Sequence, residues 1–261
     1  MWFVGCGNMA GAMVEGWRKA GVDFSQAVAI RPSGAAVEGV RTVKALPERS
    51  PAVAMLGFKP QKLDEIAPEL APKVGLETTI ISILAGVEVS SLRQRFRNAG
   101  AIIRAMPNLP VSEGRGIVAL YGEDVPADMR DQLTDLFALL GRAHWAHDEA
   151  ELAAIGSVAG AGPAYVARFI AALAKAGEAR GLAPGLAQAV ALETVAGTAL
   201  MAEARGEAME EVARRVASPN GTTEAGLAVL DDGQALDRLI AETIAAAARR
   251  GAELAAEARR P

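Results

Sequence analysis

The segment Trp2-Phe3-Val4-Gly5-Cys6-Gly7-Asn8-Met9-Ala10 decides the fold of this 261-residue chain. Its first three residues form an apolar candidate strand, which runs directly into the pattern Gly-x-Gly-x-x-Ala at the start of a helical segment, residues 10–20. In such a strand–turn–helix unit the first glycine allows a tight turn and the second lets a phosphate approach the backbone, while Ala10 keeps the helix close to the sheet. The segment therefore predicts a dinucleotide-binding turn, and a tight turn without a ligand is the alternative.

Short apolar runs alternate with helical patterns through the first half of the chain. The candidate strands are residues 2–4, 28–30, 53–56, 79–84, 102–104 and 117–120. Amphipathic segments such as residues 63–70 and 90–98 lie between them. This alternation predicts an α/β fold whose N-terminal part is a mostly parallel, doubly wound sheet of the Rossmann type.

The second half differs, because no convincing strand follows Asp148. Apolar residues recur at helical spacing in residues 165–173, 184–201, 209–216 and 236–244. We predict a Rossmann dinucleotide-binding domain over residues 1–147 and an all-α substrate and dimerisation domain over residues 148–261. The helices carry more apolar surface than a lone bundle of this length covers, so we expect a homodimer through residues 150–261.

Charge and cysteine content narrow the class of partner. The chain has 27 Lys and Arg against 31 Asp and Glu, a net charge of −4, which argues against nucleic acid or an anionic membrane as the main partner. A single cysteine excludes an internal disulfide framework and favours a reducing compartment. The N-terminal residues do not have the pattern of a signal peptide, and the longest uncharged stretch, residues 152–167, is too short to span a membrane. We expect a soluble cytoplasmic protein.

The residues after the second candidate strand indicate which dinucleotide binds. An NAD site usually has Asp or Glu about 20 residues beyond the glycines. Here Ile30 is followed by Arg31, Pro32 and Ser33, whose guanidinium and hydroxyl groups suit a 2′-phosphate. We therefore predict NADPH as the cofactor, with NADH as the alternative.

Six segments together resemble one protein family. In chain order they are Val4-Gly5-Cys6-Gly7-Asn8-Met9-Ala10, Phe58-Lys59-Pro60, Ser82-Ile83-Leu84-Ala85-Gly86-Val87, Arg104-Ala105-Met106-Pro107-Asn108, Gly160-Ala161-Gly162-Pro163-Ala164-Tyr165 and Ser218-Pro219-Asn220-Gly221-Thr222-Thr223. Over nearly its whole length the chain is similar to the pyrroline-5-carboxylate reductases. The resemblance implies NADPH-dependent reduction of a small cyclic imino acid, 1-pyrroline-5-carboxylate, to proline. It also implies two interlocked subunits and allows larger assemblies of dimers.

The resemblance also implies the site residues. The cofactor would lie against Val4, Gly5, Cys6, Gly7, Asn8 and Met9, then Gly57, Phe58, Lys59 and Pro60, then Ile83, Leu84 and Ala85, with Arg31, Ser33 and Asn108. The substrate would lie against Ser218, Asn220, Gly221, Thr222 and Thr223, with Glu149 aligned to an acidic residue of the family's substrate site.

The Ser218–Thr223 stretch has the chemistry for a cyclic imine that carries a carboxylate. Asn220-Gly221 permits a tight turn, and Thr222 or Thr223 can cap the helix that follows. The helix start offers N–H groups to the carboxylate, and Thr223, the catalytic candidate, can hydrogen-bond the ring nitrogen. The cofactor carries the hydride, so neither a metal nor a covalent nucleophile is expected. An ordinary turn and cap is the alternative reading.

Departures from the family pattern keep other functions open. Leu109 and Ala161 stand where the family usually has hydroxyl residues, Asn220 replaces a glycine, and residues 33–52 are too few for the usual helix, strand and helix. A reductase of a related ring, a pyrroline-2- or piperideine-carboxylate, is therefore the nearest alternative. A 3-hydroxyacid-type dehydrogenase would need a catalytic lysine such as Lys175, and a cofactor sensor without activity is a further class.

A His-x-x-His pair, His144 and His147, precedes the helical half and is followed by Asp148. No third ligand lies nearby in a spacing typical of zinc sites, so we predict no metal and a solvated position for both imidazoles.

Overall fold

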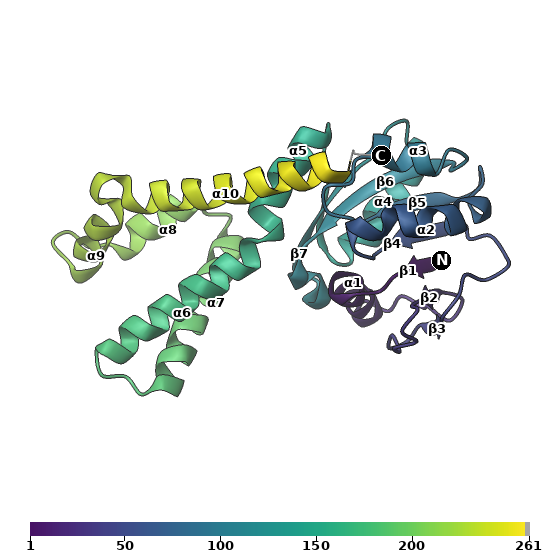
Figure 1. Ribbon diagram of the computed structural model, residues 1–261. Coiled ribbons are helices and arrows are strands. Elements are labelled where there is room, and N and C mark those ends of the chain that lie inside the picture. Colours follow the sequence, from purple (N-terminus) through teal and green to yellow (C-terminus); the bar gives the residue numbers. More distant parts are fainter. Residues whose placement is uncertain (259–261) are drawn as a thin grey trace. The chain divides into compact units, whose positions relative to one another are not determined.

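The computed structural model describes residues 1–258, and eight strands within them form one sheet (Figure 1). The strands are β1 (Trp2–Val4), β2 (Val28–Ile30), β3 (Arg41–Val43), β4 (Val53–Leu56), β5 (Thr79–Ser82), β6 (Ala101–Pro107), β7 (Gly116–Tyr121) and β8 (Gly141–Trp145). Their order is β3-β2-β1-β4-β5-β6-β7-β8, and every neighbouring pair is parallel except β6 with β7. The run 3-2-1-4-5-6 is the strand order of the Rossmann fold, which confirms the predicted fold class.

Ten α-helices lie within the described residues. They are α1 (Asn8–Lys19), α2 (Leu63–Leu70), α3 (Val89–Arg95), α4 (Ala127–Ala138), α5 (Glu149–Ile155), α6 (Gly162–Ala179), α7 (Pro184–Arg205), α8 (Met209–Val216), α9 (Thr222–Asp231) and α10 (Ala235–Ala258). Short 3-10 turns occur at Pro60–Lys62, Ala71–Lys73, Leu109–Glu113 and Asp232–Gln234, and a π-helical turn, Gly156–Gly160, joins α5 to α6. The helical second half is as predicted.

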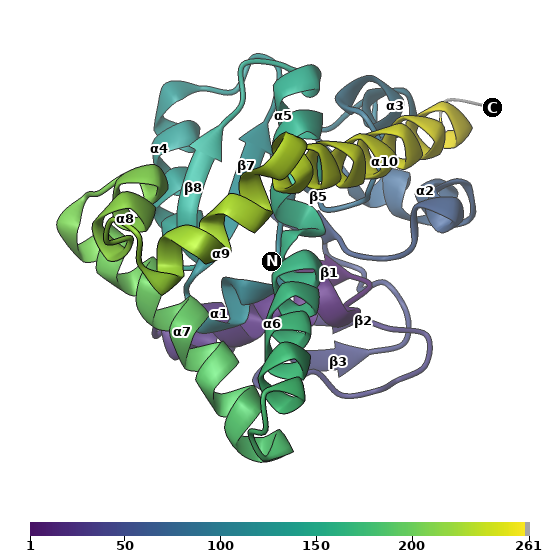
Figure 2. The ribbon, with the colours of Figure 1, turned by 90° about the vertical axis from the view of Figure 1, so that its left-hand side faces the viewer.

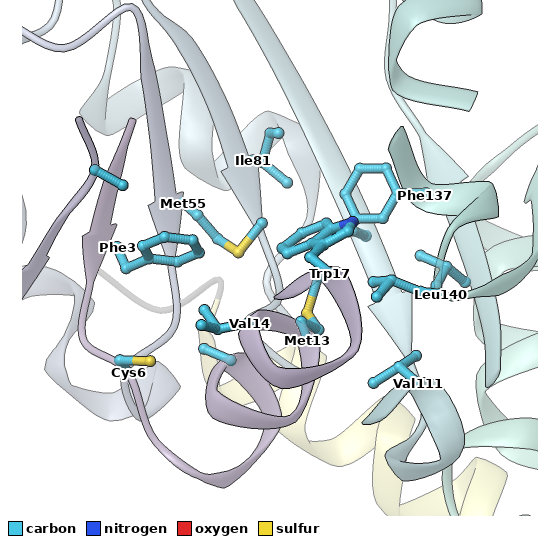
Figure 3. Close-up of a cluster of buried hydrophobic side chains, with 14 of the residues drawn as sticks. Phe3, Cys6, Met13, Val14, Trp17, Met55, Ile81, Val111, Phe137 and Leu140 are labelled. Atoms are coloured by element: carbon cyan, nitrogen blue, oxygen red, sulfur yellow. The ribbon is translucent and has the colours of Figure 1, made fainter. Parts of the chain in front are cut away.

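Two hydrophobic clusters cover the two faces of the sheet. On one face α1 points Met13, Val14 and Trp17 into a core that also contains Phe137 of α4 (Figure 3). The indole N–H of Trp17 donates to the carbonyl of Leu136 over 2.7 Å, so this buried polar group is satisfied. On the other face α2 and α3 bury their apolar side against the same strands. This three-layer packing fixes the strand ends that carry the candidate site.

The segment between β2 and β4 does not contain the helix, strand and helix that are usual there, as its short length predicts. Within the described residues it holds only the strand β3 and no helix, and the N–H of Arg31 donates to the carbonyl of Val43 over 2.8 Å. The strands β3 and β8 were not predicted, because β3 is partly exposed and β8 carries Arg142 and His144 within a mixed polar pattern.

The described chain divides into two compact units. One is Met1–Pro163 together with the residues from Ala247 onward, and the other is Ala164–Ala246. In the second unit α6 and α7 lie side by side and bury Ala174, Ala187 and Ala191 between them (Figure 2).

Two helical stretches, Glu149–Ala179 and Pro184–Arg205, are long and apolar enough to cross a membrane by length and composition alone. Many large apolar side chains of the second unit are exposed, including Phe169, Leu186, Leu192 and Leu200.

Candidate active site

The loops after β1 and β4 meet at the point where the strand order reverses. The N–H of Gly5 donates to the carbonyl of Ile30, and the N–H of Gly57 donates to the carbonyl of Val4, both over 2.9 Å. Gly5 has φ +76°, and a Cβ there would lie 2.9 Å from both the N and the Cβ of Phe58. Only glycine fits this crossing, and ligands of open α/β sheets bind at such a switch point.

The turn leaves room for a phosphate at the start of α1. Gly7 is the N-cap residue, and among the described residues no side chain caps this helix end. Among the described residues, the only atom within 4 Å of a Cβ at Gly7 would be the carbonyl oxygen of Gly57, at 4.0 Å. The N–H groups of the first turn and the positive end of the helix dipole are therefore available to a pyrophosphate, so the residues present fit a dinucleotide.

A cavity of about 620 Å³ lies along α1 and the loop after β2. Cys6 lines it, and burial raises the pKa of this thiol, with nearby Arg31 acting in the opposite direction, so the group is a neutral wall residue at pH 7. Near the far end of α1, Arg18 forms an ion pair of 2.9 Å with Glu38 from the loop.

Arg31 and Ser33, predicted to bind the 2′-phosphate, lie together in this loop. Arg31 Nη1 donates to the carbonyls of Ala35 and Ala36 over 3.0 and 3.3 Å, and Ser33 Oγ accepts from the Ala35 N–H over 3.3 Å. Both side chains thus hold the loop that replaces the usual helix. The remaining guanidinium N–H groups of Arg31 are the ones we expect to meet a phosphate.

The other two loops that we predict to bind the cofactor leave the same edge of the sheet. Lys59 is exposed and precedes a 3-10 turn that begins with Pro60, and the N–H of Ile83 donates to the carbonyl of Leu56 over 3.1 Å. Leu84 is buried in the core, whereas Ala85 is exposed. Any contact of Leu84 with a cofactor therefore comes from its backbone.

Asn108 is buried, and both ends of its amide make contacts inside the protein. Nδ2 donates to the carbonyl of Ala159 over 3.1 Å, and Oδ1 accepts from the N–H of Ile117 over 2.9 Å. The side chain thereby ties the end of β6 to the π-helical turn. We retain its cofactor contact as a proposal, and the amide has one N–H left to make it.

Glu149 has partners that the sequence did not predict. It is the first residue of α5, its carboxylate accepts from the N–H of Val89 over 2.9 Å, and it pairs with the buried guanidinium of Arg104. The carboxylate therefore joins β6, α3 and α5. The one signal in the sequence is the position of Arg104 in an otherwise apolar strand, because a charged residue that is buried there needs a partner.

The Ser218–Thr223 loop has a different cap from the one predicted. Gly221 is the N-cap residue of α9, and Thr222 and Thr223 are its first two helical residues, so neither hydroxyl caps the helix. Instead the carboxylate of Glu224 accepts from the N–H of Asn220 over 2.6 Å. Glu224 is the third helical residue, the position from which the carboxylate of a capping box bonds a backbone N–H before the helix, so the spacing Gly221-x-x-Glu224 was a readable signal; here the bond goes to the residue that precedes the N-cap.

The backbone of this loop is tightly turned. Asn220 has φ +57°, and the N–H of Gly221 donates to the carbonyl of Ser218 over 2.9 Å. A Cβ at Gly221 would collide with Ser218 Oγ and lie 2.9 Å from the Ser218 carbonyl oxygen, so a larger residue would displace this turn. Ser218 and Thr222 are exposed and Thr223 is half-buried. The loop lies in the unit Ala164–Ala246, and the loops predicted to bind the cofactor lie in the other unit.

His144 and His147 share one carboxylate, that of Glu151. Its oxygens lie 3.0 Å from His144 Nε2 and 2.6 Å from His147 Nδ1. The backbone N–H of His147, followed by the two imidazoles, lowers the pKa of Glu151 to about 2. Among residues 1–258 no group of three or more His, Cys, Asp or Glu side chains is placed to hold a metal ion.

Comparison with known proteins identifies the family. A family model named "Pyrroline-5-carboxylate reductase dimerisation" matches residues 149–254. The pyrroline-5-carboxylate reductase of Pseudomonas aeruginosa is 35% identical over 97% of this chain and 96% of its own length. The enzyme of that name from Synechocystis is 38% identical over 77% of this chain and 74% of its own.

Solved structures share the fold. The pyrroline-5-carboxylate reductase of Coxiella burnetii superimposes with a TM-score of 0.86 at 28% identity, over 97% of both chains. The Plasmodium falciparum pyrroline carboxylate reductase, solved with NADP bound, gives 0.87 at 23% identity, again over 97% of both chains. These findings confirm the resemblance read from the sequence, and the chain belongs to the pyrroline-5-carboxylate reductase family.

Proposed function

We propose that this protein reduces 1-pyrroline-5-carboxylate to proline with NADPH. The observation that carries the proposal is the 35% identity to a named reductase along nearly the whole of both chains, with the glycine crossing at Gly5 and Gly57 and the Ser218–Thr223 loop both present. Bound NADPH supplies the hydride, and the protein supplies binding and orientation.

The cofactor residues are those that follow β1, β2, β4, β5 and β6 at the carboxyl edge of the sheet. The proposed set is Val4, Gly5, Cys6, Gly7, Asn8, Met9, Arg31, Ser33, Gly57, Phe58, Lys59, Pro60, Ile83, Leu84, Ala85 and Asn108. The uncapped start of α1 binds the pyrophosphate, and Arg31 with Ser33 selects NADPH over NADH through the 2′-phosphate.

The substrate residues are Ser218, Asn220, Gly221, Thr222 and Thr223, with Glu149 as the acidic member. The Ser218 hydroxyl and the N–H of Thr222 hold the carboxylate of the imino acid, while Gly221, whose N–H already donates to the Ser218 carbonyl, shapes the turn. The Thr223 hydroxyl donates to or accepts from the ring nitrogen as its protonation changes. The carboxylate of Glu224 lies next to this anion site and accepts from the Asn220 N–H.

The proposed assembly is a homodimer through residues 150–261, which can associate further into a larger oligomer. The match of the dimerisation model and the exposed apolar side chains of α6 and α7 support it, because a second copy would cover them. The proposed domains are residues 1–147 and residues 148–261. The proposed location of the protein is the cytoplasm. Light scattering, together with mass photometry at low nanomolar concentration, tests the assembly, and an active monomer would contradict it.

A related cyclic imine is the second candidate substrate. Leu109, next to Asn108, is a large apolar residue that is 53% exposed, where the family usually has a hydroxyl. The deciding experiment measures NADPH oxidation with 1-pyrroline-5-carboxylate, a pyrroline-2-carboxylate and a piperideine-carboxylate, with NADPH binding measured in parallel. Turnover of the first substrate at the highest kcat/KM supports the proposal. Preference for another ring would replace it, and binding of NADPH without any turnover would indicate a cofactor sensor.

A further inference from the structure

The C-terminal end of α10 contacts the loops that follow β4 and β5, within one compact unit of the structure (Figure 2). Gly86, just after the cofactor loop of β5, has φ +74°. A Cβ at Gly86 would lie 2.9 Å from the backbone N of Ala255 and 3.0 Å from the carbonyl carbon of Leu254. The helix backbone therefore rests directly on the Gly86 turn, and this approach requires glycine.

The same end of α10 also faces the loop after β4. Leu254 and Glu257 bound a cavity of about 170 Å³ together with Pro60, Gln61 and Asp64. Leu254 and Ala255 are half-buried, whereas their neighbours along the helix are exposed, so one face of the last turns is used. The two loops that α10 touches are those of the proposed cofactor residues Lys59-Pro60 and Ile83–Ala85.

Ion pairs stiffen the parts that meet there. On α10 the guanidinium of Arg250 pairs with two carboxylates, since Nη1 lies 2.7 Å from Glu253 Oε2 and 3.4 Å from Glu257 Oε1. These ion pairs link the last turns of the helix to one another. In addition, Arg95 of α3 forms an ion pair of 2.6 Å with Asp64 of α2, which links the two helices that follow the loops after β4 and β5. Both loops are therefore held between a rigid base and the end of α10.

We propose that Leu254 and Ala255 are positioning residues for the cofactor, because they fix the Gly86 turn and with it the loops after β4 and β5. The inference rests on the proposed function, since it assumes that these loops bind NADPH. Loops ordered in advance lose less conformational entropy on binding, so loss of this contact weakens NADPH binding without changing the chemistry of the bound complex.

The test measures NADPH binding by fluorescence titration and steady-state kinetics on the full-length protein. Leu254→Ala and Gly86→Ala should raise the Kd for NADPH on the order of five- to tenfold, as expected when a loop must be ordered on binding. The KM for the imino acid and kcat at saturating NADPH should change less than about twofold, since the substrate loop is unaltered. Leu254→Met should keep the parental Kd, and Arg249→Ala, at an exposed position of the same helix, should leave it unchanged.

Each outcome separates this inference from the proposed function. If the parent protein does not bind NADPH, the proposed function fails. If the parent binds it and folded, dimeric Leu254→Ala binds it equally well, the positioning role is wrong while the function stands. A fall in kcat with an unchanged Kd would also overturn the inference. Should Gly86→Ala fail to fold, Leu254→Ala decides the question, because it removes only a half-buried side chain at the end of the helix.

Discussion

Arg104 and Glu149 form an ion pair that joins β6 to the first residue of α5, the point at which the dimerisation match begins. The Arg104 side chain is only 7% exposed and that of Glu149 28%. The carboxylate of Glu149 also accepts from the N–H of Val89, the first residue of α3, so it contacts that helix as well. A buried guanidinium with one carboxylate partner depends strongly on that partner.

We therefore expect Glu149→Ala to lower the free energy of unfolding by about 3 kcal/mol, because it leaves Arg104 buried without its partner. Urea unfolding at a fixed protomer concentration measures it, since the stability of a dimer depends on concentration. Replacing both residues, Arg104→Met with Glu149→Met, should recover most of the loss. Asp64→Ala, which removes the exposed carboxylate that pairs with Arg95, is the control and should cost less than about 1 kcal/mol. An equal effect of the two alanine variants would contradict the structural role of Glu149.

Two glycines of α1 should respond in opposite directions to alanine. A Cβ at Gly16 would collide with the carbonyl of Val111 and lie 2.8 Å from Leu140 Cδ2, whereas nothing lies within 4 Å of a Cβ at Gly11. Gly16→Ala should therefore destabilise the protein by about 1–3 kcal/mol through overpacking. Gly11→Ala should stabilise it by up to about 1 kcal/mol through helix propensity. Thermal unfolding of the two variants measures both effects, and a Gly16→Ala variant as stable as the parent would contradict the packing of α1.

The features predicted correctly from the sequence are the local ones. The strand–turn–helix unit at Gly5 depends on residues within ten positions, so its pattern was sufficient. The edge strand β8 was missed, because Arg142 and His144 disrupt the apolar run that marks a strand. The pair of Arg104 with Glu149 spans 45 positions and is created only by the packing of three elements.

The cap of α9 was predicted wrongly for a different reason. Hydroxyl residues are favoured caps, so Thr222 and Thr223 were the expected choice. The helix begins at Thr222, with Gly221 as the N-cap residue, so both threonines lie inside it, and the carboxylate of Glu224 bonds the N–H of Asn220 just before the helix.

Arg31→Ala should raise the KM for NADPH more than the KM for NADH. A charge-assisted contact with the 2′-phosphate contributes roughly 1.5–3 kcal/mol, which corresponds to about ten- to a hundredfold. Because Arg31 also holds the carbonyls of Ala35 and Ala36, part of the loss comes from the loop and affects both cofactors equally. The ratio of the two KM values is therefore the deciding quantity. Arg41→Ala, on the exposed end of β3, is the matched control, and an equal rise for both cofactors would exclude a 2′-phosphate contact.

Glu151 should make stability depend on pH in the acid range. Its pKa is lowered to about 2 by the N–H of His147 and by the two imidazoles, so the ionised form is favoured in the folded state. The stability that it contributes is complete above its ordinary value of 4.5 and is lost as the pH falls from there toward 2. Glu151→Gln should lower Tm at pH 7, and the difference from the parent should shrink below about pH 4.5. A difference in Tm that stays constant between pH 7 and pH 3 would contradict this assignment.

Thr223→Ala should lower kcat/KM for the imino acid by about one to two orders of magnitude, as expected from the loss of a hydrogen bond of roughly 1.5–3 kcal/mol. Thr223 is the second residue of α9 and does not cap it, so the substitution should leave the unfolding free energy nearly unchanged. The Kd for NADPH should also stay the same, since the cofactor loops lie in the other unit. Thr223→Ser keeps the hydroxyl and should keep most of the activity.

Glu224→Ala supplies the comparison for Thr223→Ala, because it removes the bond to the Asn220 N–H and loosens the turn without removing a hydroxyl. We expect it to lower stability by about 1 kcal/mol, as for the loss of a helix cap. A Thr223→Ala variant that folds normally and turns over like the parent would show that the Thr223 hydroxyl does not contact the ring nitrogen. A loss of activity shared equally by both variants would instead indicate that the shape of the turn matters and the hydroxyl does not.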